Sequence, residues 1–344
     1  MELVTGLAIA TIVIVLIFDY TNGFHDASNI IATVIASRAM TPIQAVIVVA
    51  TFEFLGPLLG GTAVANTIGK FIDLSALTNV TSLGIILAGV IGAIAWNLGT
   101  WWFGIPSSSS HALVGGLVGP VIVSAGPSHV AWGFREFFLH GHATGVTKVL
   151  LALILSPIIG FWVGFLIQRS TGMLLRGARP SLNHHLRRSQ IVTTAWLAFS
   201  HGTNDAQKSM GIITLVLVSA KFIGSFEVQF WTILACAFAI TMGILSGGWR
   251  IVRTVGFGIY KVRPLHALNA QVTAAAVIFG AALVGGPVST THVVSSSIMG
   301  IGASERPKSV RWAKAKDIIA TWLITIPGAA AVGILAWLVV QVLL

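Results

Sequence analysis

Long apolar stretches alternate with short polar segments along the whole chain. Each half contains about five stretches long enough to cross a hydrocarbon core of ~30 Å. By residue number they are 3–36, 43–65, 83–104, 106–126 and 147–169, then 190–218, 226–247, 265–285, 286–303 and 317–342. The fourth stretch of each half is short and rich in Gly, Ser and Thr, which predicts a broken helix or a re-entrant hairpin. The pattern predicts an all-α, polytopic membrane protein with about ten membrane segments.

Composition agrees with a chain that lies in a bilayer. Of its 344 residues, 55% are hydrophobic and 9% are charged, whereas soluble domains carry roughly 25% charged residues. The mean hydropathy is +0.90. The net charge of +10 comes mostly from short loops between apolar stretches, as in the cytoplasmic loops of membrane proteins. This distribution argues against nucleic acid as a partner and for the lipid bilayer as the environment.

Two polar motifs occur twice, in the same order. The first reads Asn-Gly-Phe-His-Asp-Ala-Ser-Asn over 22–29 and His-Gly-Thr-Asn-Asp-Ala-Gln-Lys over 201–208. The second reads Pro-Ser-Ser-Ser-Ser-His over 106–111 and Pro-Val-Ser-Thr-Thr-His over 287–292. Motifs that recur in both halves of an apolar chain are typical of duplicated membrane transporters, whose sites lie at the repeat interface.

Loop charge predicts that the two repeats have inverted topology. Some loops are rich in Lys and Arg, and their counterparts in the first half hold one basic residue each, Lys70 or Arg135. The basic loops are 170–189, 248–264 and 304–316, and the nearly neutral ones are 66–82 and 127–147. An odd number of spans per repeat requires this asymmetry. Two parallel repeats, or no duplication, are the alternatives.

We therefore expect three parts along the chain. The first inverted repeat covers 1–169, a basic cytoplasmic linker covers 170–189, and the second inverted repeat covers 190–344. Both termini would lie outside and the linker inside. We expect a multi-pass protein of the bacterial inner membrane that forms a homo-oligomer, with a soluble regulatory protein as a candidate partner of the linker.

The polar tracts 21–28 and 200–209 interrupt two of the membrane stretches. Irregular backbone at membrane depth must be enclosed by protein, because lipid cannot pair its polar groups. Gly23 and Gly202 permit conformations that other residues avoid. We therefore expect the chain to unwind at both glycines and to line an enclosed cavity.

Asp26 and Asp205 are candidate coupling residues. A carboxylate at mid-membrane costs ~2.5–3.5 kcal/mol on insertion scales, so it normally faces a cavity and has a partner. The functional interpretation is a cation or proton site beside a substrate. The alternative is an aspartate that caps a helix restarting after the glycine.

The Ser/Thr runs of the second motif predict an anion site. Hydroxyls and free backbone N–H groups at a helix start bind anions, helped by the positive end of the helix dipole. Two such starts that face each other would surround a tetrahedral oxyanion with neutral donors. The alternative is a pair of helix N-caps with small residues for close packing. The candidate residues are Ser107, Ser108, Ser109, Ser110, Ser289, Thr290 and Thr291.

Further polar residues lie close to these motifs. His25 and His201 titrate in a range that suits proton relay, although a hydrogen-bonding strut is the alternative. For His111 and His292 we favour the strut. Lys208 could pair with Asp205, attract a divalent anion, or extend to the cavity mouth. Glu53, in the middle of the second stretch, is a further buried carboxylate with a structural or a proton-transfer role.

The segments 24–29 and 202–208 and the two Ser/Thr-His segments resemble the motifs of the inorganic phosphate transporter (PiT) family. The resemblance covers essentially the whole chain. The resemblance implies a symporter, built from two inverted repeats, that couples uptake of inorganic phosphate to a cation gradient. It implies that the hydroxyls of the Ser/Thr runs surround the anion. Asn204, Gln207 and Lys208 are our further candidates for binding the substrate. The residues that the resemblance places in the central site are Asp26, Asn29, Asn204 and Asp205. It implies no enzymatic activity and no cofactor besides a coupling ion, H⁺ or Na⁺.

Two departures from the family pattern bear on that ion. Sodium-coupled relatives tend to show Asn-Asp-x-x-Asn in both repeats, whereas here His25 replaces the first Asn of one copy and Lys208 the last Asn of the other. An ammonium repels Na⁺ and a histidine can carry a proton, so we favour proton coupling through Asp26, Asp205, Asn29 and His25. The alternative is a Na⁺ site at Asp26, Asn29 and Asp205. Compact relatives in the family also carry sulfate. Sulfate is therefore an alternative substrate to phosphate or a metal–phosphate complex.

Two other classes of protein remain as rivals. An intramembrane serine hydrolase would use Ser109 or Ser110 as nucleophile with a buried histidine as base. Neighbouring residues point apart on a helix, so Ser110 and His111 are poorly placed for that role. An anion channel would conduct without coupling, and concentrative uptake separates it from a transporter.

Overall fold

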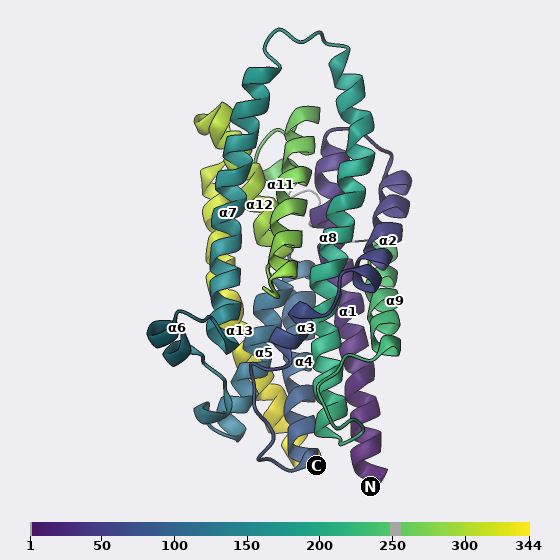
Figure 1. The fold of residues 1–344 in the computed structure, drawn as a ribbon, viewed down its shortest axis with the longest axis vertical. Coiled ribbons are helices and arrows are strands. Elements are labelled where there is room, and N and C mark those ends of the chain that lie inside the picture. The colour runs from purple at the N-terminus through teal and green to yellow at the C-terminus, as the bar shows by residue number, and fades with distance from the viewer. Residues whose placement is uncertain (1, 248–255) are drawn as a thin grey trace.

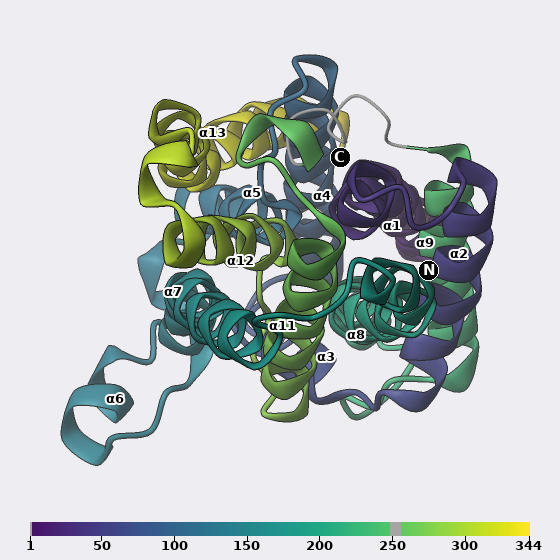
Figure 2. The ribbon, with the colours of Figure 1, turned by 90° about the horizontal axis from the view of Figure 1, so that it is seen from above.

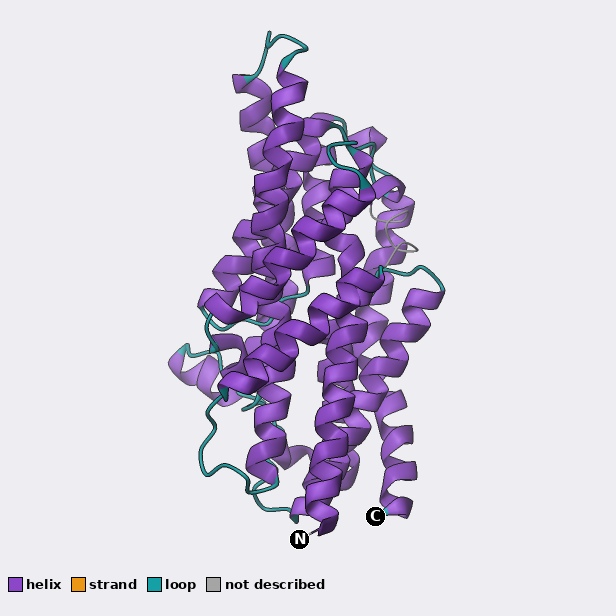
Figure 3. Cartoon of the chain, turned by 90° about the vertical axis from the view of Figure 1, so that its right-hand side faces the viewer, coloured by secondary structure: helices purple, strands orange, loops and turns teal. Residues whose placement is uncertain are grey.

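The apolar stretches form helices that run roughly along the long axis of the molecule (Figure 1). The structure, a computed structural model, describes residues 2–247 and 256–344, which leaves part of the predicted basic loop 248–264 outside. The helices are α1 (Glu2–Ala36), α2 (Pro42–Leu59), α3 (Ala63–Ile68), α4 (Asn79–Trp102), α5 (Ser109–Ser124), α6 (Phe134–His140), α7 (Gly145–Leu174), α8 (Leu182–Ser219), α9 (Phe230–Ser246), α11 (Pro264–Leu283), α12 (Thr290–Glu305) and α13 (Trp312–Leu343). Loops and short turns connect them (Figure 3).

The helices confirm the predicted class, an all-α membrane protein. Within the described residues, six helices are long and apolar enough to cross a bilayer: α1, α2, α4, α7, α11 and the part of α13 from Ala315. Helices α5 and α9 are apolar but shorter. Helix α8 has ample length and carries the second polar tract, which lowers its hydropathy.

The second predicted stretch, 43–65, is not one continuous helix. Helix α2 ends at Leu59, and the chain turns through Gly60 and Gly61 before α3 begins at Ala63. Gly61 has a φ of +78°, in the left-handed region where a side chain is unfavourable. The turn directs α3 against α8, beside the second polar tract.

The predicted unwinding at Gly23 and Gly202 is wrong, because α1 and α8 continue as helices through both polar tracts. Each glycine lies against the backbone of a neighbouring helix. A Cβ on Gly23 would overlap the carbonyl oxygen of Ile240 in α9, and one on Gly202 would overlap that of Glu53 in α2. The missing side chains therefore allow close helix packing, and backbone hydrogen bonds stay satisfied within the helices.

Two helical hairpins meet near the middle of the molecule. The first hairpin consists of α4 and α5 with a tip at 103–108, and the second consists of α11 and α12 with a tip at 284–289. They approach from opposite ends (Figure 1). At 1.5 Å per residue, each 16-residue second arm is ~24 Å long, less than a hydrocarbon core of ~30 Å. The short fourth stretches are thus the inner arms of hairpins.

The two halves of the chain interlock. Viewed from above, α1, α2, α8 and α9 form one group and the two hairpins lie with α7 and α13 in the other (Figure 2). Helix α5 packs on α13 and α12 packs on α7, so each hairpin contacts the last helix of the other half. Both termini lie at the end opposite the connection between α7 and α8 (Figure 1). The inverted relation of the repeats remains a prediction.

The predicted linker 170–189 is mostly helical. Helix α7 continues to Leu174 and α8 begins at Leu182, which leaves a short connection over 175–181. The polar ends of the two helices extend the bundle beyond the other loops (Figure 1).

Replacing Gly23 or Gly202 by Ala should destabilise the protein, although Ala favours a helix over Gly by about 1 kcal/mol. The added methyl group has to displace the backbone of α9 or α2. We expect a lower midpoint of thermal unfolding in detergent. Gly6→Ala is the matched control, because nothing lies within 4 Å of a Cβ at that position of α1. An equal or higher midpoint for Gly23→Ala and Gly202→Ala would contradict the packing role.

Candidate functional site

A buried polar cluster lies where α1, α8 and the two hairpin tips meet. Asp26 is its best-connected residue. Its Oδ1 accepts hydrogen bonds from Asn29 (2.9 Å) and Thr291 (3.0 Å) and lies 2.8 Å from His25 Nδ1. Its Oδ2 accepts a hydrogen bond from Ser109 (3.1 Å). One carboxyl group thus joins α1 to the inner arms of both hairpins.

Helical spacing explains why α1 presents these groups together. Asn22, Asp26 and Asn29 are separated by four and three residues, so they lie on one face of the helix. All are fully or almost fully buried, because that face packs against α8 and the hairpin tips. The carbonyl oxygens of both asparagine side chains are buried without a hydrogen-bond partner among the described residues. They are available to a bound cation.

Asp205 occupies the corresponding place on α8. Its Oδ1 accepts a hydrogen bond from Lys208 at 2.7 Å, and its Oδ2 accepts one from Asn22 at 3.3 Å. His201 Nε2 lies 3.5 Å from the same Oδ2. The lysine is 0% exposed, so it does not extend to a cavity mouth.

The structure brings the two aspartates together. One potential ligand atom from each of Asp26, His201 and Asp205 lies within 4.8 Å of the others, a spacing that a single cation can bridge. Carboxylate and amide oxygens suit hard cations, and Asp26, Asp205 and Asn29 offer oxygen donors of this kind to Na⁺. Each of these carboxylates can instead carry a proton.

The four serines of the first hairpin have different partners. Ser108 is the N-cap of α5 and bonds both the backbone N–H and the ring of His111. Ser109 donates to Asp26, and Ser110 donates to the carbonyl of Val288 in the second tip. Ser107 pairs with Thr100 and lies 3.5 Å from His25. The cap and anion interpretations of this run are therefore compatible.

The second hairpin repeats part of this pattern. Ser289 is the N-cap of α12, and Thr291 bonds Asp26 and Asn29. The hydroxyl of Thr290 is buried without a partner among the described residues. The rings of His111 and His292 lie side by side, with centroids 4.7 Å apart. Two helix N-termini with free or exchangeable donors thus meet beside the aspartates, which is the geometry of an anion site.

Two of the predicted site residues, Asn204 and Gln207, use their side chains to hydrogen-bond backbone groups. The amide of Asn204 donates to the carbonyl of Gly286 and accepts from the N–H of Val288, which fixes the tip of the second hairpin. Gln207 Oε1 accepts from the N–H groups of Val64 and Ala65 and so caps α3. With its amide oxygen committed to α3, Gln207 is a structural residue in this conformation.

Of three further buried polar residues, the sequence singled out Glu53 with an open structural or proton-transfer role, whereas Asn22 and Asp19 were not among the predicted site residues. Glu53 Oε1 lies 2.6 Å from His201 Nδ1, and His201 connects it to Asp205. Asn22 contacts Asp205 from α1. Asp19, two helical turns before Asp26, is fully buried beside Ser209 and Cys236. The seven-residue spacing of Asp19 and Asp26 was the available signal for the last of these.

The contacts do not form a serine-hydrolase site from Ser109 or Ser110. Neither hydroxyl contacts a histidine among the described residues, because one donates to Asp26 and the other to Val288. The pair that does meet is Ser108 and His111. Within the described part of the chain, the ring of His111 has no carboxylate partner that would orient it as a base.

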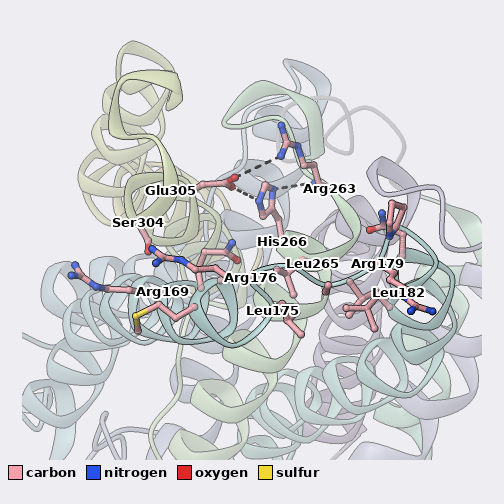
Figure 4. A pocket seen from close by; sticks show the side chains of 17 residues that line it. Arg169, Leu175, Arg176, Arg179, Leu182, Arg263, Leu265, His266, Ser304 and Glu305 are labelled. Carbon is pink, nitrogen blue, oxygen red and sulfur yellow. Dashed lines mark hydrogen bonds and ion pairs between the residues drawn. The ribbon is translucent and has the colours of Figure 1, made fainter.

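A separate basic cavity of about 640 Å³ lies at the linker end, between the ends of α7 and α12 and the starts of α8 and α11 (Figure 4). Arg169, Arg176, Arg179 and Arg263 line it. Glu305 pairs with His266 and Arg263. The guanidinium groups point in different directions, with Arg169 and Arg179 on opposite sides (Figure 4). They do not converge on one point, so the cavity is not preformed for a small anion.

Comparisons with known proteins agree with the arrangement. Residues 22–333 match the model of the phosphate transporter family. A probable low-affinity inorganic phosphate transporter of Bacillus subtilis is 43% identical over 346 residues, which cover 100% of both chains. One from Rhizobium meliloti is 40% identical over 96% of both chains. A solved structure described as the sodium-dependent phosphate transporter shares the fold, with a TM-score of 0.85 at 23% identity over 98% of this chain and 100% of that chain.

Proposed function

We propose that this chain, which belongs to the phosphate transporter family, is a secondary active symporter that takes up inorganic phosphate together with protons. The observation that carries the proposal is the buried cluster in which Asp26 bonds the inner arms of both hairpins while Asp205 lies close by. Anion donors and cation acceptors are thus within reach of each other. A symporter needs both in one enclosed place.

The hairpin tips supply donors for the anion. The N-termini of α5 and α12 carry partial positive charge and backbone N–H groups. The hydroxyls of Ser109 and Thr291 now donate to Asp26, and each can turn to an arriving phosphate oxygen. The partnerless hydroxyl of Thr290 is a further donor. These donors are neutral, so the site binds the anion without a permanent excess of positive charge.

Charge balance then requires a cation to accompany phosphate. The buried centre contains Asp26, Asp205 and Glu53, with Lys208 as the buried lysine among the described residues. A phosphate anion added to these carboxylates would leave uncompensated negative charge in a medium of low dielectric constant, which is strongly unfavourable. Cation binding at the aspartates removes that charge and makes entry of the anion possible.

Protons fit this cation site better than Na⁺ does. His25 contacts Asp26 at 2.8 Å, and His201 bridges Glu53 and Asp205. Histidine carries or releases a proton near neutral pH, and each of these rings lies beside a carboxylate with which it can exchange that proton. The ammonium of Lys208 occupies the Asp205 oxygen that a second Na⁺ would use.

Alternating access would come from movement of one group of helices against the other. The tips seal the cluster in this conformation, because the candidate residues are almost completely buried. Rocking of the group α1, α2, α8 and α9 against the hairpins would open a path to one side at a time. The hydrogen bonds between Asp26 and the tips are the contacts that opening has to break or exchange.

Uptake of labelled phosphate into proteoliposomes tests this function. With pH and Na⁺ gradients imposed separately, we expect concentrative uptake driven by an inward proton gradient and no dependence on Na⁺ at constant pH. Labelled sulfate in place of phosphate tests the alternative substrate, and a Mg²⁺ series tests whether metal–phosphate is carried. Uptake that needs Na⁺ and ignores the proton gradient would contradict proton coupling, and downhill flux without accumulation would indicate a channel.

Replacing Asp26 or Asp205 by Asn should abolish concentrative uptake while the protein still inserts. Loss of the Asp26 carboxylate removes the cation acceptor, and loss of the Asp205 carboxylate leaves the buried ammonium of Lys208 unpaired. We expect the initial rate to fall by about a hundredfold or more in each variant, equivalent to about 2.7 kcal/mol. Asp73→Asn is the matched control. Asp73 lies in an exposed loop, where hydrogen bonds from Ser75 lower the pKa of its carboxyl group, so it is ionised throughout the assay. Full accumulation by Asp26→Asn or Asp205→Asn would refute the model.

We further propose that the protein lies in the bacterial inner membrane with the linker in the cytoplasm, where basic loops are retained. The arginine-lined cavity at that end is a candidate surface for a soluble regulatory partner.

In cells, Ser181→Cys in the exposed linker should react with a membrane-impermeant thiol reagent only after permeabilisation. Ser128→Cys, exposed near the other end, should react without it. The natural Cys236 is buried and gives little background. The reverse labelling pattern would invert the topology.

A further inference from the structure

Asp26 and Asp205 each hydrogen-bond the residue three positions later in the helix, and these two residues differ in charge. Asn29 follows Asp26 by three residues, and its amide nitrogen lies 2.9 Å from Asp26 Oδ1. Lys208 follows Asp205 by three residues, and its ammonium lies 2.7 Å from Asp205 Oδ1. Residues three apart on a helix lie on the same face, so each aspartate meets its neighbour in the same way. One position holds an amide and the other holds a cation.

Lys208 cannot leave Asp205 without a large penalty. Its side chain is 0% exposed, and Asp205 is its hydrogen-bond partner within the described residues. An ammonium in a dry interior needs a paired anion, because removing one partner of a buried ion pair costs several kcal/mol. The helix keeps the two groups one turn apart in any conformation in which α8 stays intact. The ion pair therefore persists while the hairpins move.

We propose that Lys208 is a tethered cation, which permanently fills one of two matched cation positions and so determines the ion selectivity of this transporter. The inference rests on the proposed symport and deepens it. At Asp26 the neighbouring amide leaves a carbonyl oxygen, Asn29 Oδ1, without a partner among the described residues. At Asp205 the ammonium offers no acceptor atom and repels any second cation. Only the Asp26 position accepts a mobile ion.

A stoichiometric consequence follows from this assignment. A transporter with an amide at both positions would carry a mobile cation at each, whereas this chain supplies one of those charges itself. It therefore moves one cation fewer per phosphate than such a transporter. The position that remains carries His25, which favours a proton as that mobile cation.

The substitution Lys208→Asn should create a Na⁺ site. The new amide oxygen would join Asp205 and the carbonyl oxygen of Asn22, which has no partner among the described residues, as ligands. We expect NaCl, compared with choline chloride at equal ionic strength, to raise the midpoint of thermal unfolding of the purified full-length variant. The wild type should show a much smaller response. Lys208→Met is the matched control, because it removes the charge without adding an oxygen.

A lack of any Na⁺-specific shift for Lys208→Asn, or the same shift for Lys208→Met, would overturn the inference. Lys208→Gln repeats the test with a longer amide if the asparagine variant does not fold. Lys208→Arg keeps the positive charge and should stay insensitive to Na⁺, so a Na⁺ response in this variant would also count against the inference.

Transport gives the second readout. In proteoliposomes at equal pH on both sides, an inward Na⁺ gradient should increase phosphate uptake by Lys208→Asn several-fold and leave wild-type uptake unchanged. If the wild type carries no phosphate under any gradient, the proposed function fails, and the thermal measurement still decides the role of Lys208. If the wild type carries phosphate and Lys208→Asn gains no Na⁺ stimulation, the tethered cation is wrong and the symport stands.

Discussion

Burial of carboxyl groups in a membrane interior is the constraint on which the rest of this structure depends. Lipid cannot solvate a charge, so each buried acid has to find its partners within the protein. Asp26 finds them in both hairpins, which holds the tips on α1. Glu53 finds His201, which joins α2 to α8. The same pairs that stabilise the closed centre are those that an arriving anion and cation have to exchange, so stability and transport use one set of contacts.

Much of the fold follows from the apolar pattern, and the exceptions have identifiable causes. Each of the ten predicted stretches contains a helix, because length and hydropathy are local properties of the sequence. Gly23 and Gly202 were misinterpreted because a missing side chain permits both an unwound backbone and close helix packing. The choice depends on Ile240 and Glu53, which lie far away in sequence. Likewise, Gln207 caps α3, a partner that no local pattern indicates.

The candidate site shows the same division between local and long-range information. The repeated motifs were enough to single out Asp26, Asp205 and the two hydroxyl runs, which the structure gathers in one cluster. The contact between Glu53 and His201 joins two helices of different halves, so no spacing in the sequence could predict it. Asn204 belongs to the right region, but it holds the backbone of the second hairpin tip. The repeated motif predicted the region in which Asn204 lies, but not its hydrogen bonds to Gly286 and Val288.

The exchange of packing partners between the halves has a consequence for biosynthesis. The inner arm α5 lies against α13, a helix of the second half that is made long after it. During translation the first hairpin therefore waits in the membrane, with its polar tip lacking its final neighbours, until α13 has been inserted. Contacts of such high sequence separation form late and slowly. A chain cut short before α13 would leave α5 without this packing partner, so the first hairpin reaches its final surroundings only once the second half of the chain is in place.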